Sequence, residues 1–304
     1  MDGARLSGLV RRQTDILDWT PTKSARFPAP RTPVVTLELW TILGSLLFPV
    51  ISPAQSPPST TRIEEFLKTA DVVKAQPVGK GVTETWRLTL TDGEITHDAS
   101  FQSVDERAPA KDLGGGRTEV HFVDSYRYNI AAYRLARLLG LDDMVPVSVA
   151  RKWRTKTGAF TWWVDDVLMD EGGMKEKGLK APDEASWSEQ IYRVRLFSQL
   201  VQDTDRNRGN LLITTEWRIW MIDFTRAFRR WPKLQSPQGL ERCDRKLLEA
   251  LREVTRKDLE AALKDTLSHV EIEGLVARRD LLVQHYEALV RERGESAVLY
   301  EPRR

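Results

Sequence analysis

Apolar and polar residues alternate in the first half of the chain in the way that β-strands require. Residues 86–90 and 95–101 each place every second side chain on an apolar face, and Asp92 with Gly93 stands between them. An Asp-Gly pair between two alternating segments is a typical hairpin turn. The pattern therefore predicts two antiparallel strands joined by a tight turn.

The same region contains other segments of strand or loop character. Short apolar segments with strand composition occur at residues 72–75, 145–153 and 159–168. Residues 105–118 contain proline, several charges and three consecutive glycines, which is the composition of a mobile loop. We therefore expect a β-rich half that is interrupted by one long loop.

A different period, with apolar residues three and four positions apart, indicates helices. It occurs in a short amphipathic segment at residues 61–70, and again at residues 125–139, where Gly140 ends the pattern. In the second half Asp183 is placed to cap a long helix that runs towards Gln202.

The last third of the chain is helical too. The pairs Thr255 with Asp258 and Ser268 with Glu271 each have the hydroxyl and the acid, three residues apart, of a capping box. The arginines of this part, among them Arg278, are expected on a solvated helix face.

These segments divide the chain into consecutive parts. The parts are an N-terminal region (1–54), a linker with a short helix (55–70), a β-rich half (71–168), a glycine- and lysine-rich connector (169–182) and a mostly helical half (183–304). The expected fold class is therefore α+β.

The overall composition is compatible with one large domain or two closely packed lobes. The chain has 304 residues, of which 41% are hydrophobic, enough to bury a full core. Its 46 basic and 44 acidic residues leave a net charge of +2, so nothing indicates nucleic-acid or membrane binding through bulk charge. One cysteine and four scattered histidines exclude an intrachain disulfide and a zinc site of Cys and His.

The N-terminal region has the parts of an export signal. Residues 39–52 are apolar, they follow a long basic lead, and the small residues Ser52 and Ala54 favour cleavage after Ala54. This predicts a secreted or periplasmic protein. Residues 33–52 are alternatively long enough for a membrane anchor, although Glu38 and two prolines weaken it. A tail with a chance apolar segment, in a cytoplasmic protein, is the third interpretation.

The strongest functional signal lies in residues 202–228. Asp205 is followed by Asn210 five residues later and by Asp223 thirteen residues after that. Phosphoryl transfer requires the protein to align a nucleophile and to neutralise the transferring group, usually through magnesium. Asp205 is therefore expected to accept the hydroxyl proton. Asn210 and Asp223 supply the hard oxygen ligands that magnesium prefers, provided that residues 211–222 form a hairpin.

Two alternatives bear on this segment. Asp203 is a second acid close to Asp205, but only Asp205 has the five-residue step to Asn210. The segment could also be a polar turn between a helix and a strand, with Asp223 paired to an arginine. The strand-borne sequence Ile222-Asp223-Phe224 at the expected interval favours the nucleotide site.

The sequence DRNRGN followed by IDF resembles the catalytic and metal-binding loops of the atypical kinase group that includes phosphatidylinositol kinases, HipA-like bacterial protein kinases and secretory-pathway kinases. The resemblance extends more weakly over residues 72–230. It implies a two-lobed protein-kinase-like fold with a β-rich N-lobe and a mostly helical C-lobe. It also implies ATP as co-substrate and magnesium, or manganese, as cofactor.

The resemblance further implies a set of nucleotide-binding residues. The hairpin PVGKGVTETWRLTL would cover the phosphates, which assigns Gly79, Lys80 and Gly81 to them. In such kinases a strand lysine contacts the phosphates and pairs with a helix glutamate. The matching positions are Gln102 and Asn129, two amides that could bond to each other but supply no cation.

The source of the missing cation stays open. Lys80 could reach in from the neighbouring strand, as in the with-no-lysine kinases, or it could be a solvated turn lysine. Arg87 and Lys111 are further candidates.

Two functional hypotheses follow. One is a kinase-like phosphotransferase that moves the γ-phosphate of ATP to a hydroxyl of a protein, a lipid or a small molecule. The other is a pseudokinase or nucleotide-binding interaction module without turnover. A purely structural α+β protein would leave residues 202–228 unexplained. No nucleic-acid partner is indicated, and a membrane contact is expected only through an uncleaved N-terminal segment.

Overall fold

The computed structural model describes residues 58–78 and 85–303. The predicted signal peptide or anchor lies outside the described residues, as do Gly79, Lys80 and Gly81. Among the helices that are described, none is both long and apolar enough to cross a bilayer.

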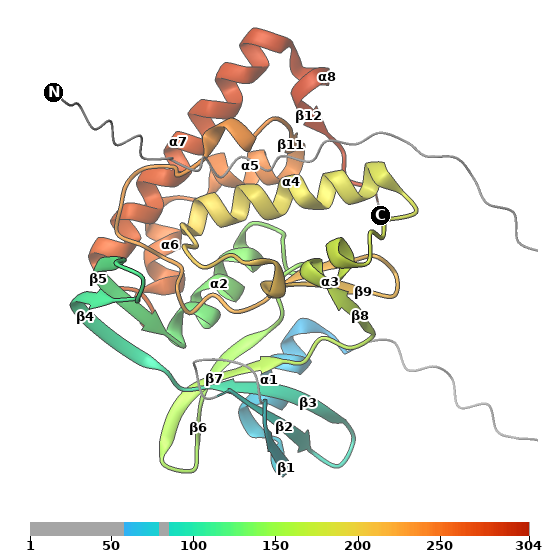
Figure 1. Cartoon of the computed structure of the whole chain (residues 1–304), viewed down its shortest axis with the longest axis vertical. Helices are drawn as coiled ribbons and strands as arrows, with labels where there is room; N and C mark the ends of the chain where they lie inside the picture. The colour runs from blue at the N-terminus through green and yellow to red at the C-terminus, as the bar shows by residue number, and fades with distance from the viewer. Residues whose placement is uncertain (1–57, 79–84, 304) are drawn as a thin grey trace, which may run out of the picture. The chain divides into compact units, whose positions relative to one another are not determined.

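The β-rich half contains a five-stranded antiparallel sheet (Figure 1). Across the sheet the strands are β1 (Asp71–Pro77), β2 (Thr85–Thr91), β3 (Thr96–Gln102), β7 (Lys156–Trp162) and β6 (Ser148–Trp153). As the alternation predicted, Leu88 and Leu90 of β2 and Ala99 and Phe101 of β3 are buried. Two helices, α1 (Thr60–Thr69) and α2 (Arg127–Leu138), pack against β6 and β7.

The prediction of a mobile loop at residues 105–118 is wrong. These residues belong to an antiparallel hairpin of β4 (Asp105–Asp112) and β5 (Thr118–Ser125). Most side chains of β4 are exposed, and its charged residues with Ala108, Pro109 and Ala110 show no apolar alternation that would reveal a strand. Three glycines with positive φ, Gly114, Gly115 and Gly116, turn the chain between the strands.

A small second sheet leads into the helical half. Its strands are β8 (Val167–Asp170), β9 (Leu211–Thr214) and β10 (Ile219–Met221), with β9 in the middle. The antiparallel pairing of β9 with β10 confirms the hairpin predicted for this segment. The strand predicted at residues 159–168 is divided between β7 and β8, and Asp166 between them has a φ of 54°. The connector contains a short helix, α3 (Glu171–Glu176).

The helical half begins at the predicted cap. The carboxylate of Asp183 accepts hydrogen bonds from the backbone N of Ala185 and Ser186, at 3.0 and 3.1 Å, and α4 (Glu184–Val201) follows. Both predicted capping boxes are present, at the starts of α6 (Arg256–Leu263) and α7 (His269–Arg293). The other elements are α5 (Arg245–Glu253), α8 (Glu295–Val298), the 3-10 helices η1 (Arg208–Asn210) and η2 (Pro237–Gly239), and the parallel strands β11 (Cys243–Asp244) and β12 (Leu299–Tyr300).

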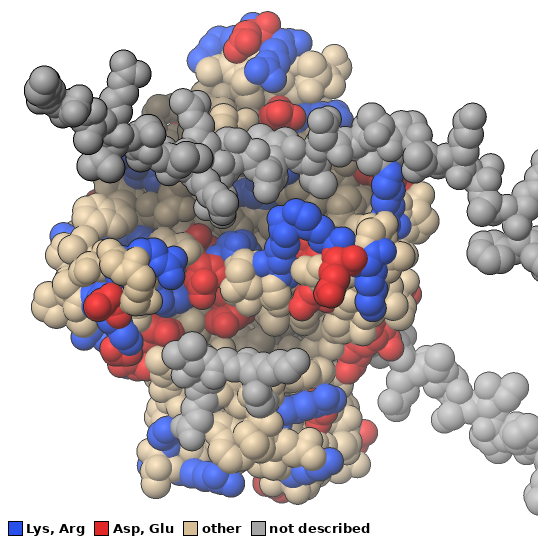
Figure 2. Space-filling model, in the orientation of Figure 1, with Lys and Arg blue, Asp and Glu red and all other residues tan. Residues whose placement is uncertain are grey.

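One hydrophobic core runs through both halves. It joins Phe66 and Leu88 of the β-rich half to Phe197, Phe224 and Tyr286 of the helical half, and each of these is at most 2% exposed. Acidic and basic side chains are interspersed over the face seen in Figure 2. Any preference for a charged ligand on this face must therefore come from local groups.

Arg278 does not lie on a solvated face, contrary to the prediction, because it is fully buried. Its guanidinium donates to the backbone oxygens of Leu200, Arg229 and Trp231, at 2.7, 2.7 and 2.6 Å. Burial lowers the pKa of Arg278 to about 9. Helical periodicity could not reveal this position, since the oxygens come from two other segments of the chain.

Candidate active site

The loop between α4 and β9 carries the predicted base, Asp205. The loop starts at Gln202, whose φ of 48° ends the helix. The carboxylate of Asp203 is buried, pairs with Arg206 and accepts a hydrogen bond from the backbone N of Asp205 at 3.0 Å. Asp203 therefore holds the loop together, which supports Asp205 as the acid that remains available.

Asp205 is exposed, and its carboxylate has no hydrogen-bond or ion-pair partner in the part of the chain that the structure describes. Its backbone oxygen, in contrast, accepts from the backbone N of Asn207 at 2.7 Å and from Nδ2 of Asn210 at 3.1 Å. These contacts fix the backbone while the carboxylate stays free to accept a proton. Because Asn210 donates through its amide nitrogen, its amide oxygen remains available as a ligand.

Arg206 ties this loop to the segment that contains Asp223. Its Nη1 donates to the backbone oxygens of Asn210 and Ile222, at 2.9 and 2.6 Å, and the backbone N of Ile222 donates to the oxygen of Asn210 at 3.0 Å. The guanidinium also lies 4.4 Å from the ring centre of Phe224. The backbone of Asn210 is thus bonded to that of Ile222, the residue before Asp223.

Asp223 has a φ of 55°, in the left-handed region that residues other than glycine adopt rarely. Its Oδ1 accepts a hydrogen bond from Oγ1 of Thr225 at 3.0 Å. The next residue, Phe224, donates its backbone N to Oδ1 of Asn129 at 2.7 Å. Such backbone strain persists only where the surroundings hold it, and it is frequent at functional sites.

Gln102 and Asn129 form the amide pair that the sequence allowed. Both are buried, and Nδ2 of Asn129 donates to Oε1 of Gln102 at 2.6 Å. Asn129 therefore connects β3, through Gln102, to the turn at Asp223, through Phe224. The pair thus fixes the turn at Asp223 relative to β3 but contributes no charge.

Asp124, at the end of β5, is a site residue that the sequence did not reveal. Its Oδ1 is buried without a hydrogen-bond partner. Burial raises the pKa of the Asp124 carboxyl. The Thr225 hydroxyl and Arg226 oppose the shift, and the nearby Asp223 carboxylate adds to it. The neighbouring Ser125 donates its backbone N to the oxygen of Thr225 at 2.9 Å, which fixes β5 beside Asp223. No local signal marks Asp124, because this proximity depends on the hairpin.

The donor groups fit a hard divalent cation. An amide oxygen on Asn210, the carboxylate of Asp223 and the unpartnered Oδ1 of Asp124 belong to adjoining segments, and magnesium and manganese prefer oxygen ligands of these kinds. An orphaned buried carboxylate oxygen is costly unless something satisfies it, and a cation would do so.

Solved structures have the same fold. The structure of hydra Fam20 with sugar matches with a TM-score of 0.60 at 16% sequence identity, over 80% of this chain and 92% of that chain. The Golgi casein kinase, also solved with Mn and ADP bound, matches with a TM-score of 0.57 at 13% identity, over 79% of this chain and 78% of its own. No protein-family model and no curated protein sequence matches the chain.

These matches concern the fold, and they agree with the order of elements described above. A β-rich N-lobe is followed by a mostly helical C-lobe, in which Asp205 follows α4, Asn210 is the last residue of η1 and Asp223 follows β10. The chain has the two-lobed α+β architecture of an atypical kinase-like fold.

Proposed function

We propose that this chain is an ATP-dependent phosphotransferase that moves the γ-phosphate to a hydroxyl acceptor. The observation that carries the proposal is the hydrogen-bonded unit in which Arg206 holds Asn210 beside the turn of Asp223 while the carboxylate of Asp205 stays unpartnered. A kinase-like fold, and the Mn and ADP bound in the Golgi casein kinase that shares this fold, support it.

Each side chain has a role in this mechanism. Asp205 accepts the proton of the acceptor hydroxyl while the hydroxyl oxygen forms a bond to the γ-phosphorus. The bond from that phosphorus to the bridging oxygen breaks, and ADP leaves. Asn210 and Asp223 would hold magnesium or manganese, with Asp124 as a third oxygen donor. Such an ion neutralises the phosphate oxygens.

A second function, nucleotide binding without turnover, is favoured by one specific observation. Gln102 and Asn129 stand where a lysine and a glutamate are expected, and their hydrogen bond closes the position with two neutral amides. A cation for the phosphates must then come from elsewhere. Of the three candidates that the sequence offers, Arg87 pairs with Asp98 and Lys111 pairs with Glu106, which leaves Lys80.

The test measures magnesium-dependent ATP binding and turnover on the full chain. We expect binding and turnover in the parent and loss of both in Asp223→Ala, whereas Asp280→Ala, an exposed aspartate on α7, serves as the matched control. Lys80→Ala should weaken ATP binding if Lys80 supplies the cation. ATP binding without turnover would contradict the phosphotransferase proposal and support the nucleotide-binding module. A folded chain that binds no ATP would contradict the nucleotide site itself.

The acceptor class is open to the same assay. Because the hydra relative was solved with a sugar, a sugar hydroxyl is one acceptor to test beside protein serine and threonine and lipid hydroxyls. A radiolabelled γ-phosphate that appears on one of the three identifies the class, and the Asp205→Asn variant controls for transfer by contaminants.

A further inference from the structure

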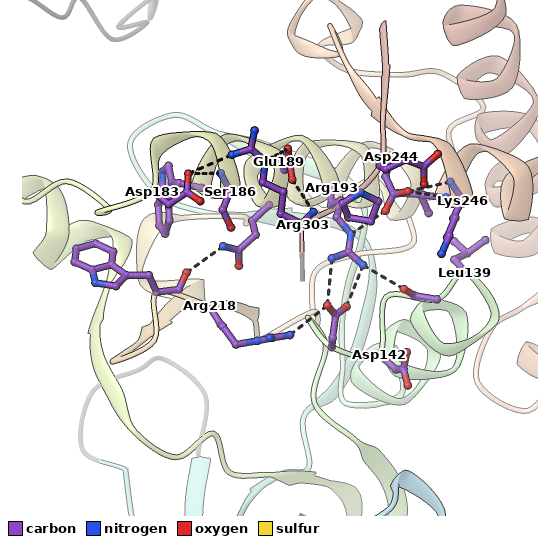
Figure 3. Close-up of a pocket in the computed structure, with 18 of the residues that line it drawn as sticks. Leu139, Asp142, Asp183, Ser186, Glu189, Arg193, Arg218, Asp244, Lys246 and Arg303 are labelled. Atoms are coloured by element: carbon purple, nitrogen blue, oxygen red, sulfur yellow. Dashed lines mark hydrogen bonds and ion pairs between the residues drawn. The ribbon is translucent and has the colours of Figure 1, made fainter. Parts of the chain in front are cut away.

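A hollow in the described chain lies away from the proposed active site. Its volume is about 810 Å³, and none of Asp205, Asn210 and Asp223 lines it. Its walls come from the residues after α2, from α4, from the turn between β9 and β10, from the start of α5 and from the segment that follows β12 (Figure 3). The proposed phosphotransfer leaves this hollow without a role.

The hollow is lined by an excess of three negative charges. Seven carboxylates and four cations line it, namely Asp142, Asp143, Asp183, Glu189, Glu216, Asp244 and Glu301 with Arg193, Arg218, Lys246 and Arg303. Arg245, which is not part of the lining, pairs with Glu301 at 2.9 Å, so an excess of two negative charges remains. Such an excess in a recess favours positively charged ligands.

Part of this charge is neutralised within the wall. Arg193 is only 11% exposed and donates to both carboxylate oxygens of Asp143, at 3.0 and 3.2 Å, while its Nε lies 3.6 Å from Asp244. Arg218 contacts Asp143 as well, at 3.4 Å. These four residues form a balanced network that shapes the wall and offers no free charge.

Other carboxylates of the hollow are free. Asp142 and Glu216 are exposed, and within the described residues neither has a hydrogen-bond or ion-pair partner. Both line the hollow: Asp142 lies in the segment after α2, and Glu216 lies in the turn between β9 and β10. They are available to a cation that enters from outside.

The hollow already holds one guanidinium of the chain itself. Arg303 donates its backbone N to Glu189 at 3.0 Å, and its side chain lies 3.5 Å from Glu189 and 3.8 Å from Asp183. Figure 3 shows Arg303 beside Glu189 in the hollow. The side chain of Arg303 is 59% exposed, so these ion pairs are solvated and weak. A second arginine could therefore displace it at little cost.

Apolar groups complete the surface. Trp187 and Trp217 meet edge to face with ring centres 6.3 Å apart, and Leu138, at 41% exposed, lies in the same lining. Arginine carries an apolar stem below its charged head, and its guanidinium also stacks on aromatic rings. Lysine has no planar group that would use these rings equally well.

We propose that this hollow is a docking site for an arginine-containing segment of a partner protein, which displaces Arg303. Asp142 and Glu216 bind the entering guanidinium groups, Glu189 and Asp183 take over the one that replaces Arg303, and the two tryptophans contact the stems. The inference does not depend on the proposed phosphotransfer. It predicts an affinity that falls as salt is added, because the charges lie at an exposed rim.

The test is fluorescence anisotropy of the full chain with a labelled ten-residue peptide that contains two arginines, proline and leucine. A second peptide carries glutamine in place of both arginines. We expect the arginine peptide to bind and the glutamine peptide to bind at least about tenfold more weakly. Asp142→Asn combined with Glu216→Gln should weaken the arginine peptide about tenfold.

Matched variants complete the design. Asp112→Asn combined with Glu106→Gln removes the same charges from β4, which contributes no residue to the hollow, and should leave binding unchanged. Arg303→Gln removes the competing guanidinium and should tighten binding severalfold. Equal binding of the two peptides would overturn the proposal, as would equal loss in both double variants. Displacement by spermine at the same concentration as by the peptide would reduce the hollow to an unspecific cation site.

Discussion

The helical side and the β-rich side of the proposed active site are both held by hydrogen bonds of buried or half-buried side chains, but they differ in charge. On the helical side, Asp203 with Arg206 and the carboxylates of Asp205 and Asp223 give a site rich in charge. On the β-rich side, Gln102 and Asn129 are neutral: Asn129 donates to Gln102 at 2.6 Å and accepts from the backbone N of Phe224, after Asp223, at 2.7 Å. Side chains of such a site can therefore hold the backbone in place without supplying charge. Both sides hold the backbone, but the amide pair on the β-rich side lacks the charges that a lysine and a glutamate would supply.

The largest effect is expected at the charged side. Asp205→Asn keeps the shape of the side chain but removes the base, so the rate of phosphate transfer should fall about 10³-fold while ATP binding is retained. Single-turnover kinetics and calorimetric ATP titration separate the two. If Asp203→Asn instead abolished transfer and Asp205→Asn did not, the roles of the two acids would have to be exchanged.

The support behind the loop should matter next. Arg278→Met removes the donors to three buried backbone oxygens, and the free energy of unfolding should fall by about 3 kcal/mol. Urea denaturation measures the change. Arg278→Lys keeps the positive charge but only part of the hydrogen-bond geometry, so its free energy of unfolding should lie between those of the wild type and Arg278→Met. A change below about 0.5 kcal/mol would show that the oxygens find other partners.

The neutral side can be recharged with little change of shape. Gln102→Lys combined with Asn129→Asp keeps an acceptor for the backbone N of Phe224 and introduces a cation beside the expected phosphates. We expect affinity for magnesium-ATP to rise about tenfold, as measured by calorimetry. Unchanged affinity would indicate that another cation, such as Lys80, already fulfils that role.

The smallest effect concerns Asp124. Because burial raises its folded pKa, the wild type loses stability as the pH rises from about 4 through that pKa, and the loss is complete above it. Asp124→Asn should therefore raise the free energy of unfolding by about 1 kcal/mol at pH 7. Its advantage should vanish below about pH 4.

The same variant should bind Mn²⁺ more weakly, as followed by electron paramagnetic resonance. Stability gained at the expense of binding is typical of functional residues. A variant that is less stable at pH 7 would mean that Asp124 has only a structural role.

The sequence revealed features that depend on local order. The cap at Asp183 and the capping boxes of α6 and α7 involve neighbours along the chain, and they occur where they were predicted. The spacing of Asp205, Asn210 and Asp223 is also a feature of the sequence alone, whereas the roles of these residues stay a prediction.

The features that escaped prediction depend on partners far away in the sequence. The β4 and β5 hairpin is largely solvent-exposed, so no apolar period marks it. The backbone oxygens that accept hydrogen bonds from the buried Arg278 belong to residues 49 and 78 positions before it. Asp124 becomes part of the site only because β5 bonds to Thr225, one hundred residues later.

The shared core has a consequence for how the chain folds and breaks. Phe66 and Leu88 of one lobe pack in the same cluster as Phe197 and Tyr286 of the other, so neither lobe has a complete interior of its own. Heating should therefore melt both lobes in one cooperative transition. A protease cut in the connector should yield two fragments that stay associated or precipitate, rather than a soluble lobe that survives alone.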